Sequence, residues 1–313
     1  MLLGRTANGL YWMLRYIERS ENMARLVDAG LRIALTNPEA GSDHWLSVVE
    51  SAGVSEPYRA RYPEYDGERV VDFLLRDTSN PSSVLAAIDA ARTNARMVRT
   101  AITRETWEAV NDAWMTLKGA LTRQVKERDL PDTLELIKRQ TALIRGAFHS
   151  TMLRNENYDF ARLGTFIERA DSTARILDVK YFVLLPSVSL VGSALDNYQW
   201  ESILRSVSAH RAYRWQYEGD FNSTDIADFL ILNPRMPRSL LFCYRSIHEN
   251  LTYLARDYGT HHPCHDRAAA VLDKLENATI ADVFETGLHE FLADLIHQTN
   301  DLGLDISAAY RFN

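Results

Sequence analysis

The stretch LYWMLRYIERSENMARLVD, residues 10–28, decides the fold, because a second version of it, FARLGTFIERADSTARILD, occupies residues 160–178. At an offset of 150 the two stretches share the dipeptide Glu-Arg, at Glu18-Arg19 and at Glu168-Arg169. Conservative pairs such as Glu21 and Asp171 lie between the identities. Similarity at a fixed offset is the sequence signature of a repeated structural unit. We therefore predict a tandem duplication.

The similarity continues downstream in both copies, where the offset grows to 155 and then to 156. The matched residues there are Trp45 with Trp200, Asp72-Phe73-Leu74 with Asp228-Phe229-Leu230, Pro81 with Pro237, Ser83 with Ser239, and Asn94 with Asn250. The predicted repeats are residues 1–156 and 157–313. No low-complexity or proline-rich linker separates them, so we expect one continuous helical body.

The composition favours long helices and argues against several classes of protein. Gly (14) and Pro (9) are scarce among 313 residues, and both interrupt helices. Two cysteines cannot form a disulfide framework. No uncharged apolar run reaches the ~18 residues of a membrane span, and charged residues interrupt any apolar signal segment near the N-terminus. The net charge of −7 argues against nucleic-acid binding through a basic face. We expect a cytoplasmic protein that binds neither membrane nor nucleic acid.

Apolar periodicity predicts an all-α protein, a duplicated helical bundle whose two halves are related by a pseudo-twofold axis. Asn80 is expected to cap a helix that opens at Pro81, Met236-Pro237 to open its counterpart, and Asn37-Pro38 to stop the first helix. We find no alternating strand pattern. The expected helices span residues 10–36, 43–52, 68–75, 81–103, 105–126, 132–149, 158–183, 199–217, 224–232, 237–256, 264–275 and 280–302.

The two Glu-Arg helices each carry an apolar stripe beside a charged stripe. Residues such as Met13, Ile17 and Val27, and in the second copy Leu163 and Leu177, recur at spacings of three and four, which predicts a buried face. The charged stripe is Glu18, Glu21, Arg25 and Asp28 in the first copy and Glu168, Asp171, Arg175 and Asp178 in the second.

Three interpretations of the charged stripe remain open. It can be a solvated face with weak ion pairs, a buried structural network, or a ligand or metal site. The charges have the same sign in both copies, which favours the last two, because a solvated face has little physical reason to keep them. Arg19 and Arg169 lie among aromatic and aliphatic neighbours, so we expect them to be at least partly buried. Buried charges must then pair or face a cavity, because an unpaired buried ion costs several kcal/mol.

The chain resembles the alpha-E family, a bacterial all-helical domain named for its Glu-Arg motif. The resemblance covers essentially the whole chain and rests on Tyr16-Ile17-Glu18-Arg19-Ser20-Glu21-Asn22 and Phe166-Ile167-Glu168-Arg169-Ala170-Asp171. It includes Asn80-Pro81-Ser82-Ser83, Arg92-Thr93-Asn94-Ala95-Arg96, Ser150-Thr151-Met152 and Pro237-Arg238-Ser239. Thr93 departs from the Glu that is common in relatives.

The resemblance implies a place in an amide-bond-forming or peptide-modifying system. Alpha-E proteins are typically encoded beside, or fused to, a circularly permuted ATP-grasp ligase, often near a transglutaminase-like protease. The expected partners are therefore an ATP-grasp ligase and, as a second candidate, a transglutaminase-like protein, and a homo-oligomer is compatible with the sequence. The chain has no Gly-rich phosphate loop or Walker-type lysine, so we expect no ATP site and no cofactor of its own.

We consider three functions. As an accessory subunit, the chain would hold carboxylate groups with Arg19, Arg25, Arg169 and Arg175, while Glu18 and Glu168 orient those arginines or bind an amine. As an enzyme, it would use Glu18 or Glu168 as a general base on an amide or amino-acid substrate. As a structural adaptor, it would use the Glu-Arg pairs only to lock its helices together.

Other charged residues complete the candidate site. The binding group includes Glu21, Asp171, Asp28 and Asp178. Arg92 and Arg96, on one predicted helical face, can bind a carboxylate or phosphate, or form a solvated basic face. We assign no metal ligands, because the Glu-x-x-His pairs of di-metal bundles are absent from the Glu-Arg helices, and magnesium held by the carboxylates stays an open alternative.

Overall fold

The computed structural model describes residues 2–36, 43–182, 193–219 and 221–312, and all regular structure in these segments is helical. The prediction of an all-α protein is confirmed. The helices of the N-terminal half are α1 (Gly4–Thr36), α2 (Asp43–Ser51), α3 (Ser55–Arg59), α4 (Gly67–Leu75), α5 (Val84–Met97), α6 (Arg104–Ala120), η2 (Glu127–Asp129) and α7 (Leu130–Thr151). Those of the C-terminal half are α8 (Glu156–Phe182), α9 (Ala194–Ser206), α10 (His210–Gln216), α11 (Ser223–Ile231), α12 (Leu240–Tyr258), α13 (Pro263–Asn277), α14 (Ile280–Thr286) and α15 (Leu288–Ala309).

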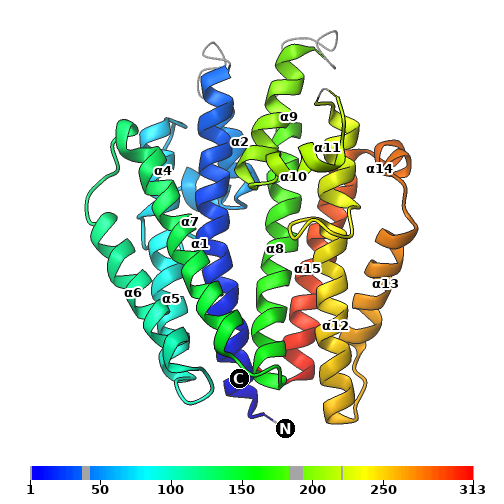
Figure 1. Ribbon diagram of the computed structural model, residues 1–313. Helices are drawn as coiled ribbons and strands as arrows, with labels where there is room; N and C mark the ends of the chain where they lie inside the picture. The colour runs from blue at the N-terminus through cyan, green and yellow to red at the C-terminus, as the bar shows by residue number, and fades with distance from the viewer. Residues whose placement is uncertain (1, 37–42, 183–192, 220, 313) are drawn as a thin grey trace.

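The two Glu-Arg helices, α1 and α8, stand side by side at the centre of the molecule (Figure 1). Helices α5 and α7 pack on α1, and α12 and α15 pack on α8. The two ends of the chain lie at the same end of the bundle (Figure 1). This arrangement covers both central helices, so that their charged stripes as well as their apolar stripes lie inside the protein.

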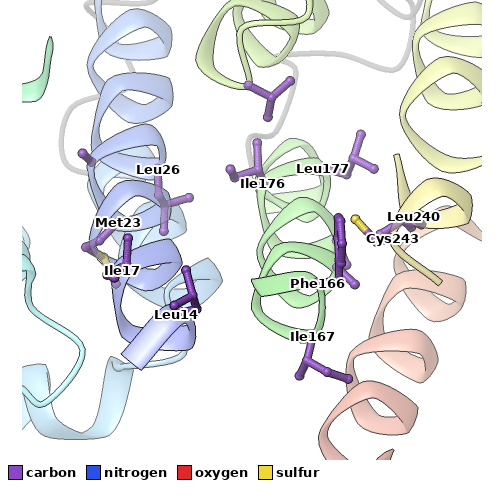
Figure 2. Packing of buried hydrophobic residues seen from close by; sticks show 14 of the residues in the cluster. Leu14, Ile17, Met23, Leu26, Phe166, Ile167, Ile176, Leu177, Leu240 and Cys243 are labelled. Carbon is purple, nitrogen blue, oxygen red and sulfur yellow. The ribbon is translucent and has the colours of Figure 1, made fainter. Parts of the chain in front are cut away.

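The apolar stripes build the core as the periodicity predicts. Met13, Ile17 and Val27 of α1 and Leu163 and Leu177 of α8 are fully buried. Figure 2 shows how these helices contribute to the buried cluster, with Phe166 of α8 beside Cys243 of α12. At about 25 cal/mol per Å² of buried apolar surface, this cluster is the main favourable term in folding.

Several helix boundaries differ from the sequence predictions, each for a local reason. The predicted starts at Pro81 and at Met236-Pro237 are wrong, because the hydroxyls of Ser83 and Ser239 cap the helices by accepting from the amides of residues 86 and 242. α5 ends at Met97, well before the predicted residue 103. Asn37-Pro38 lies outside the described residues, and α1 ends at Thr36.

Two predicted long helices are each divided in two. The helix expected over 199–217 is split into α9 and α10 at Ser208, whose φ is +57°, and the one expected over 280–302 is split into α14 and α15 at Gly287, whose φ is +96°. A positive φ is incompatible with a continuing right-handed helix. The short helix α3 was not predicted from the sequence.

The backbones of α1 and α8 approach closely at Gly164. A Cβ atom added there would lie 2.0 Å from the carbonyl oxygen of Tyr11 and 2.9 Å from its carbonyl carbon. Because the obstacle is backbone, it cannot rotate aside. Gly164 therefore sets how closely the two central helices pack.

We expect Gly164→Ala to lower the free energy of unfolding by about 3 kcal/mol or more, because overpacked sites cost 1–3 kcal/mol even where side chains can adjust. Gly146→Ala on α7 is the matched control, because a Cβ there meets nothing within 4 Å. This control should raise stability by up to about 1 kcal/mol through helix propensity. Urea unfolding measures both, and equal effects of the two substitutions would show that the close approach does not limit packing.

Candidate functional site

The charged stripe of α1 is buried, and that of α8 is buried at Glu168 and Asp178 and partly exposed at Asp171 and Arg175. Glu18 is 1% exposed, Glu21 0% and Glu168 5%, while Arg25 and Arg169 are also buried. The interpretation of a solvated face is therefore wrong for these residues. The prediction that Arg19 and Arg169 are at least partly buried is confirmed, since 21% and 10% of their side chains are exposed.

The two Glu-Arg dipeptides pair reciprocally across the α1–α8 interface. Arg169 donates from Nε to Oε1 of Glu18 at 2.8 Å and from Nη2 to Oε2 at 3.0 Å. Arg19 donates from Nε to Oε1 of Glu168 at 2.6 Å and from Nη2 to Oε2 at 2.9 Å. Each pair is a parallel two-bond contact, the strongest geometry for a guanidinium and a carboxylate. The motif of each helix is thus completed by the other helix.

The first network surrounds Glu18 and Glu21. Arg25 donates to Oε1 of Glu21 at 2.6 Å, and Arg238 reaches both acids, at 3.2 Å from Glu18 and 2.5 Å from Glu21. Arg145 of α7 pairs with both as well, and Thr141 donates to Oε2 of Glu21 at 2.8 Å. The members of the first network are Glu18, Glu21, Arg25, Arg145, Arg169 and Arg238.

The second network surrounds Glu168 and Asp171. Besides the Arg19 pair, Arg15 donates from Nε to Oε2 of Glu168 at 2.7 Å. Arg175 donates from Nε to Oδ2 of Asp171 at 2.7 Å and from Nη2 to Oδ1 at 3.3 Å. The members of the second network are Arg15, Arg19, Glu168, Asp171 and Arg175. It has one arginine fewer than the first network and the same number of carboxylates.

Arg25 and Arg175 are also anchored to backbone at the ends of neighbouring helices. Arg25 donates from Nη1 to the carbonyl oxygen of Ser206 at 2.7 Å and to Oγ of Ser208 at 2.9 Å. Arg175 donates from Nη1 to the carbonyl oxygen of Ser51 at 3.4 Å. Gly53, with φ +69°, gives Arg175 its room, because a Cβ there would lie 2.9 Å from Nη1.

The arginines keep the buried carboxylates ionised. Burial alone would raise the pKa of Glu18, but Arg169, Arg238 and Arg145 outweigh it and lower that pKa to about 2. For Glu168, Arg19 and Arg15 likewise outweigh burial and lower the pKa to about 2. Burial and the neighbouring Arg25 lower the pKa of Arg238 to about 10, against the pull of the two acids. Ionised, fully paired carboxylates position arginines well but accept protons poorly.

A cavity of about 190 Å³ opens beside the second network. Its charged wall consists of Arg15, Arg19, Glu168, Asp171 and Arg175, and its apolar wall of Met23, Leu26 and Ile176. The volume far exceeds the ~15 Å³ that one water requires and falls below the ~300 Å³ of clefts for drug-sized molecules. The geometry therefore suits a small charged ligand.

The remaining candidate residues lie away from this cavity. Asp28 pairs with Arg32 at 3.0 Å and Lys138 at 3.6 Å. Asp178 accepts from His289 at 2.7 Å, and burial raises its pKa. Arg92 lies on the ring of Trp114 and donates to Asn111, while Arg96 is exposed. Although α5 packs on α1, neither Arg92 nor Arg96 forms an ion pair with a described member of either network.

Sequence reasoning missed three arginines that complete the networks: Arg15, Arg145 and Arg238. Arg15 lies one helical turn before Arg19, so the spacing of four contained a usable signal. Arg145 and Arg238 come from α7 and from the residue before the cap of α12, far from the motifs in sequence. Only tertiary packing brings them to Glu18 and Glu21.

In the part of the chain that the structure describes, no group of three or more His, Cys, Asp or Glu side chains is placed to hold a metal ion. None of the described helices combines the length and apolar character that crossing a membrane requires.

The alpha-E family model, described as a predicted alpha-helical domain with a conserved ER motif, matches residues 2–310. The chain belongs to the alpha-E family. The Glu-Arg dipeptide occurs four times in this alpha-E chain, at Glu18-Arg19, Glu68-Arg69, Glu127-Arg128 and Glu168-Arg169, and the first and last of these are the two that pair reciprocally. No curated protein and no solved structure matches the chain.

We expect Glu168→Gln to lower the free energy of unfolding by about 3–5 kcal/mol, because it leaves Arg15 and Arg19 without a buried counter-charge. Glu108→Gln is the control, because Glu108 pairs with Arg104 on the surface, where the side chains are 51% and 78% exposed. This control should leave stability nearly unchanged. Chemical denaturation measures both variants, and a small effect at residue 168 would contradict a buried, essential pair.

The lowered pKa values of Glu18 and Glu168 predict sensitivity to acid. When the pKa of a carboxylate is lower in the folded than in the unfolded state, the carboxylate stabilises the fold fully at pH values above the unfolded-state pKa. This stabilisation is lost as the pH falls toward the folded-state pKa. The free energy of unfolding should therefore decrease between about pH 4.5 and about pH 2. The stability difference between the native protein and Glu168→Gln should shrink over that range, and a difference that stays constant would exclude the linkage.

Proposed function

We propose that this alpha-E chain is a helical accessory subunit of an amide-bond-forming system that includes an ATP-grasp ligase. The observation that carries the proposal is the charged cavity beside the second network, which can bind a small ligand. The chain has no sequence motif for nucleotide binding, so ATP would have to be bound by a partner. The ligase would supply ATP-dependent activation, and this chain would supply a charged site for a small substrate or a peptide end. The same proposal includes a cytoplasmic location and, as a further partner, a transglutaminase-like protein.

The geometry supports binding and positioning rather than proton transfer. Glu168 holds Arg15 and Arg19 in fixed orientations, and Asp171 holds Arg175. Held in this way, the arginines form a preorganised charged wall, which lowers the entropy that binding costs. Side chains of Arg19 and Arg175 remain 21% and 27% exposed, so part of each guanidinium is available to a ligand.

We also propose that the two halves of the chain are duplicated units related by a pseudo-twofold axis. Their contacts support it: Glu18 pairs with Arg169 as Glu168 pairs with Arg19. Arg25 binds the carbonyl oxygen of Ser206 as Arg175 binds that of Ser51. The left-handed residues that follow these carbonyls, Ser208 and Gly53, occupy matching positions.

The two alternatives have different support. A stand-alone enzyme with Glu18 or Glu168 as a general base is disfavoured, because a base with a pKa of about 2 accepts protons poorly near neutral pH. A purely structural adaptor is favoured by the first network, whose carboxylates are at most 1% exposed. The cavity beside the second network favours the subunit over the adaptor.

Co-purification tests the subunit proposal. A tagged chain isolated at native salt from the source organism should retain an ATP-grasp protein in near-stoichiometric amount, identified by mass spectrometry. With ATP and a mixture of the proteinogenic amino acids, the pair should release phosphate faster than either protein alone. Arg175→Met should lower this rate without loss of co-purification, because it alters the cavity wall.

Arg104→Met is the matched control, because Arg104 is a surface arginine with 78% of its side chain exposed. It should change neither rate nor co-purification. A chain that purifies alone, or a pair no faster than the ligase by itself, would contradict the proposal.

A further inference from the structure

The two networks differ at the position of one guanidinium. At the offset of 156 that aligns Pro81 with Pro237, Arg238 aligns with Ser82. Arg238 enters the first network, whereas Ser82 lines the cavity beside the second. The second network therefore has Ser82, and beside it a cavity, where the first network has the buried side chain of Arg238.

Each contact of Arg238 has a counterpart that lines the cavity. Arg238 contacts Glu18 at 3.2 Å, Glu21 at 2.5 Å and Oδ1 of Asn22 at 3.1 Å. At the offset of 150, these residues correspond to Glu168, Asp171 and Ser172. All three line the cavity, together with Ser82. The acceptors for a cation are therefore present, and the arginine that would fill them is absent.

The second network also lacks a counterpart of Arg145, and Arg15 partly replaces it. Aligning Gln140-Thr141 of α7 with Gln298-Thr299 of α15 places Arg145 opposite Gly303. A Cβ at Gly303 would lie 3.3 Å from Nη1 of Arg15. Arg15 thus uses the space beside Gly303 and pairs with Glu168. No described side chain takes the place of Arg238 in the same way.

Asp171 is the carboxylate left with the fewest partners. Its counterpart Glu21 is paired with Arg25, Arg145 and Arg238 and accepts from Thr141. In the described segments, the ion pair of Asp171 is with Arg175, and 13% of its side chain is exposed. A cationic group in the cavity would give Asp171 a second partner and give the second network the same four-to-two ratio of cations to carboxylates as the first.

We propose that the cavity binds a small organic cation whose guanidinium or primary ammonium group occupies the position equivalent to the guanidinium of Arg238. The cation would donate hydrogen bonds to Asp171 and Glu168, with Ser172 and Ser82 beside it. The aliphatic part of the ligand would lie against Met23, Leu26 and Ile176. This binding is a property of the chain alone. Identifying the cation as the amine component of an amide-bond-forming reaction rests in addition on the proposed function.

Binding of agmatine to the purified full chain, measured by isothermal titration calorimetry, tests the proposal, because agmatine carries both a guanidinium and an ammonium group. We expect saturable binding that n-butylammonium reproduces more weakly. Asp171→Asn should weaken it at least about tenfold, since the removed charge is the ligand's main partner. Thr100→Arg, which adds a charge at an exposed position, is the control and should leave binding within about twofold.

The substitution Ser82→Arg would place a guanidinium of the protein itself in the cavity, where the ligand's cationic group is proposed to bind. It should abolish agmatine binding while the melting temperature equals or exceeds that of the native protein. Ser82→Met, which fills similar space without charge, should lower the melting temperature. These stability readouts keep the test independent of the ligase, whose absence would affect only the proposed function.

Three outcomes would overturn the proposal. The first is saturable binding of acetate or inorganic phosphate with no binding of either cation, which would make the cavity an anion site on Arg19 and Arg175. The second is no saturable binding of any probe. The third is a Ser82→Met variant that is more stable than Ser82→Arg, since the cavity would then have no preference for a cation.

Discussion

The reciprocal pairing of two glutamates with two arginines across the α1–α8 interface is the constraint on which the rest of the structure depends. Removing these four charges from water costs several kcal/mol per ion, and the cost is offset only when the geometry is good and the remaining hydrogen-bonding atoms are satisfied. Both pairs meet this condition, with two parallel bonds each. A shift of one helix along the other by a single turn would break both pairs at once. The pairs therefore fix the register of the two helices more sharply than an apolar interface could, since apolar contacts tolerate sliding.

This register has consequences for the surrounding helices. The contact of Gly164 with the backbone of Tyr11 brings α1 and α8 close enough for Arg19 and Arg169 to cross the interface. Glu21, one turn after Glu18, pairs with Arg25 of the same helix, with Arg145 of α7 and with Arg238 just before α12. Three segments distant in sequence, α7, α8 and the residues before α12, are thus tied to Glu18 and Glu21 of α1.

The sequence predicted the elements of this arrangement but not its connections. Periodicity identified the apolar stripes, and the matching signs of the charged stripes indicated buried carboxylates at Glu18 and Glu168, because those signals are local to one helix. Which arginine meets which carboxylate depends on the packing of separate helices, so Arg145 had no local signal, and Arg238 stood out only as part of the family motif Pro237-Arg238-Ser239. Helix starts at Pro81 and Pro237 were predicted three residues early, since the choice between an asparagine cap and a serine cap is decided by the turn before the helix. The break at Ser208 was missed because a positive φ at serine has no sequence signature.

Two acidic pairs that align in the sequence, Glu18 with Glu21 and Glu168 with Asp171, have different surroundings in the structure. In the first network Arg238 and Arg145 enclose Glu18 and Glu21, and a site filled by its own side chains can only stabilise the fold. In the second network Ser82 and Gly303 stand in the aligned positions, and the same carboxylate pattern borders a cavity. Stability alone favours filling such a cavity, because unfilled space forfeits packing contacts and leaves charges partly exposed. A cavity at one acidic pair, opposite a closed site at the other, is therefore better explained by a ligand than by the demands of folding. The ligand is expected to be a cation, because the first network contains the guanidinium of Arg238 at the corresponding position.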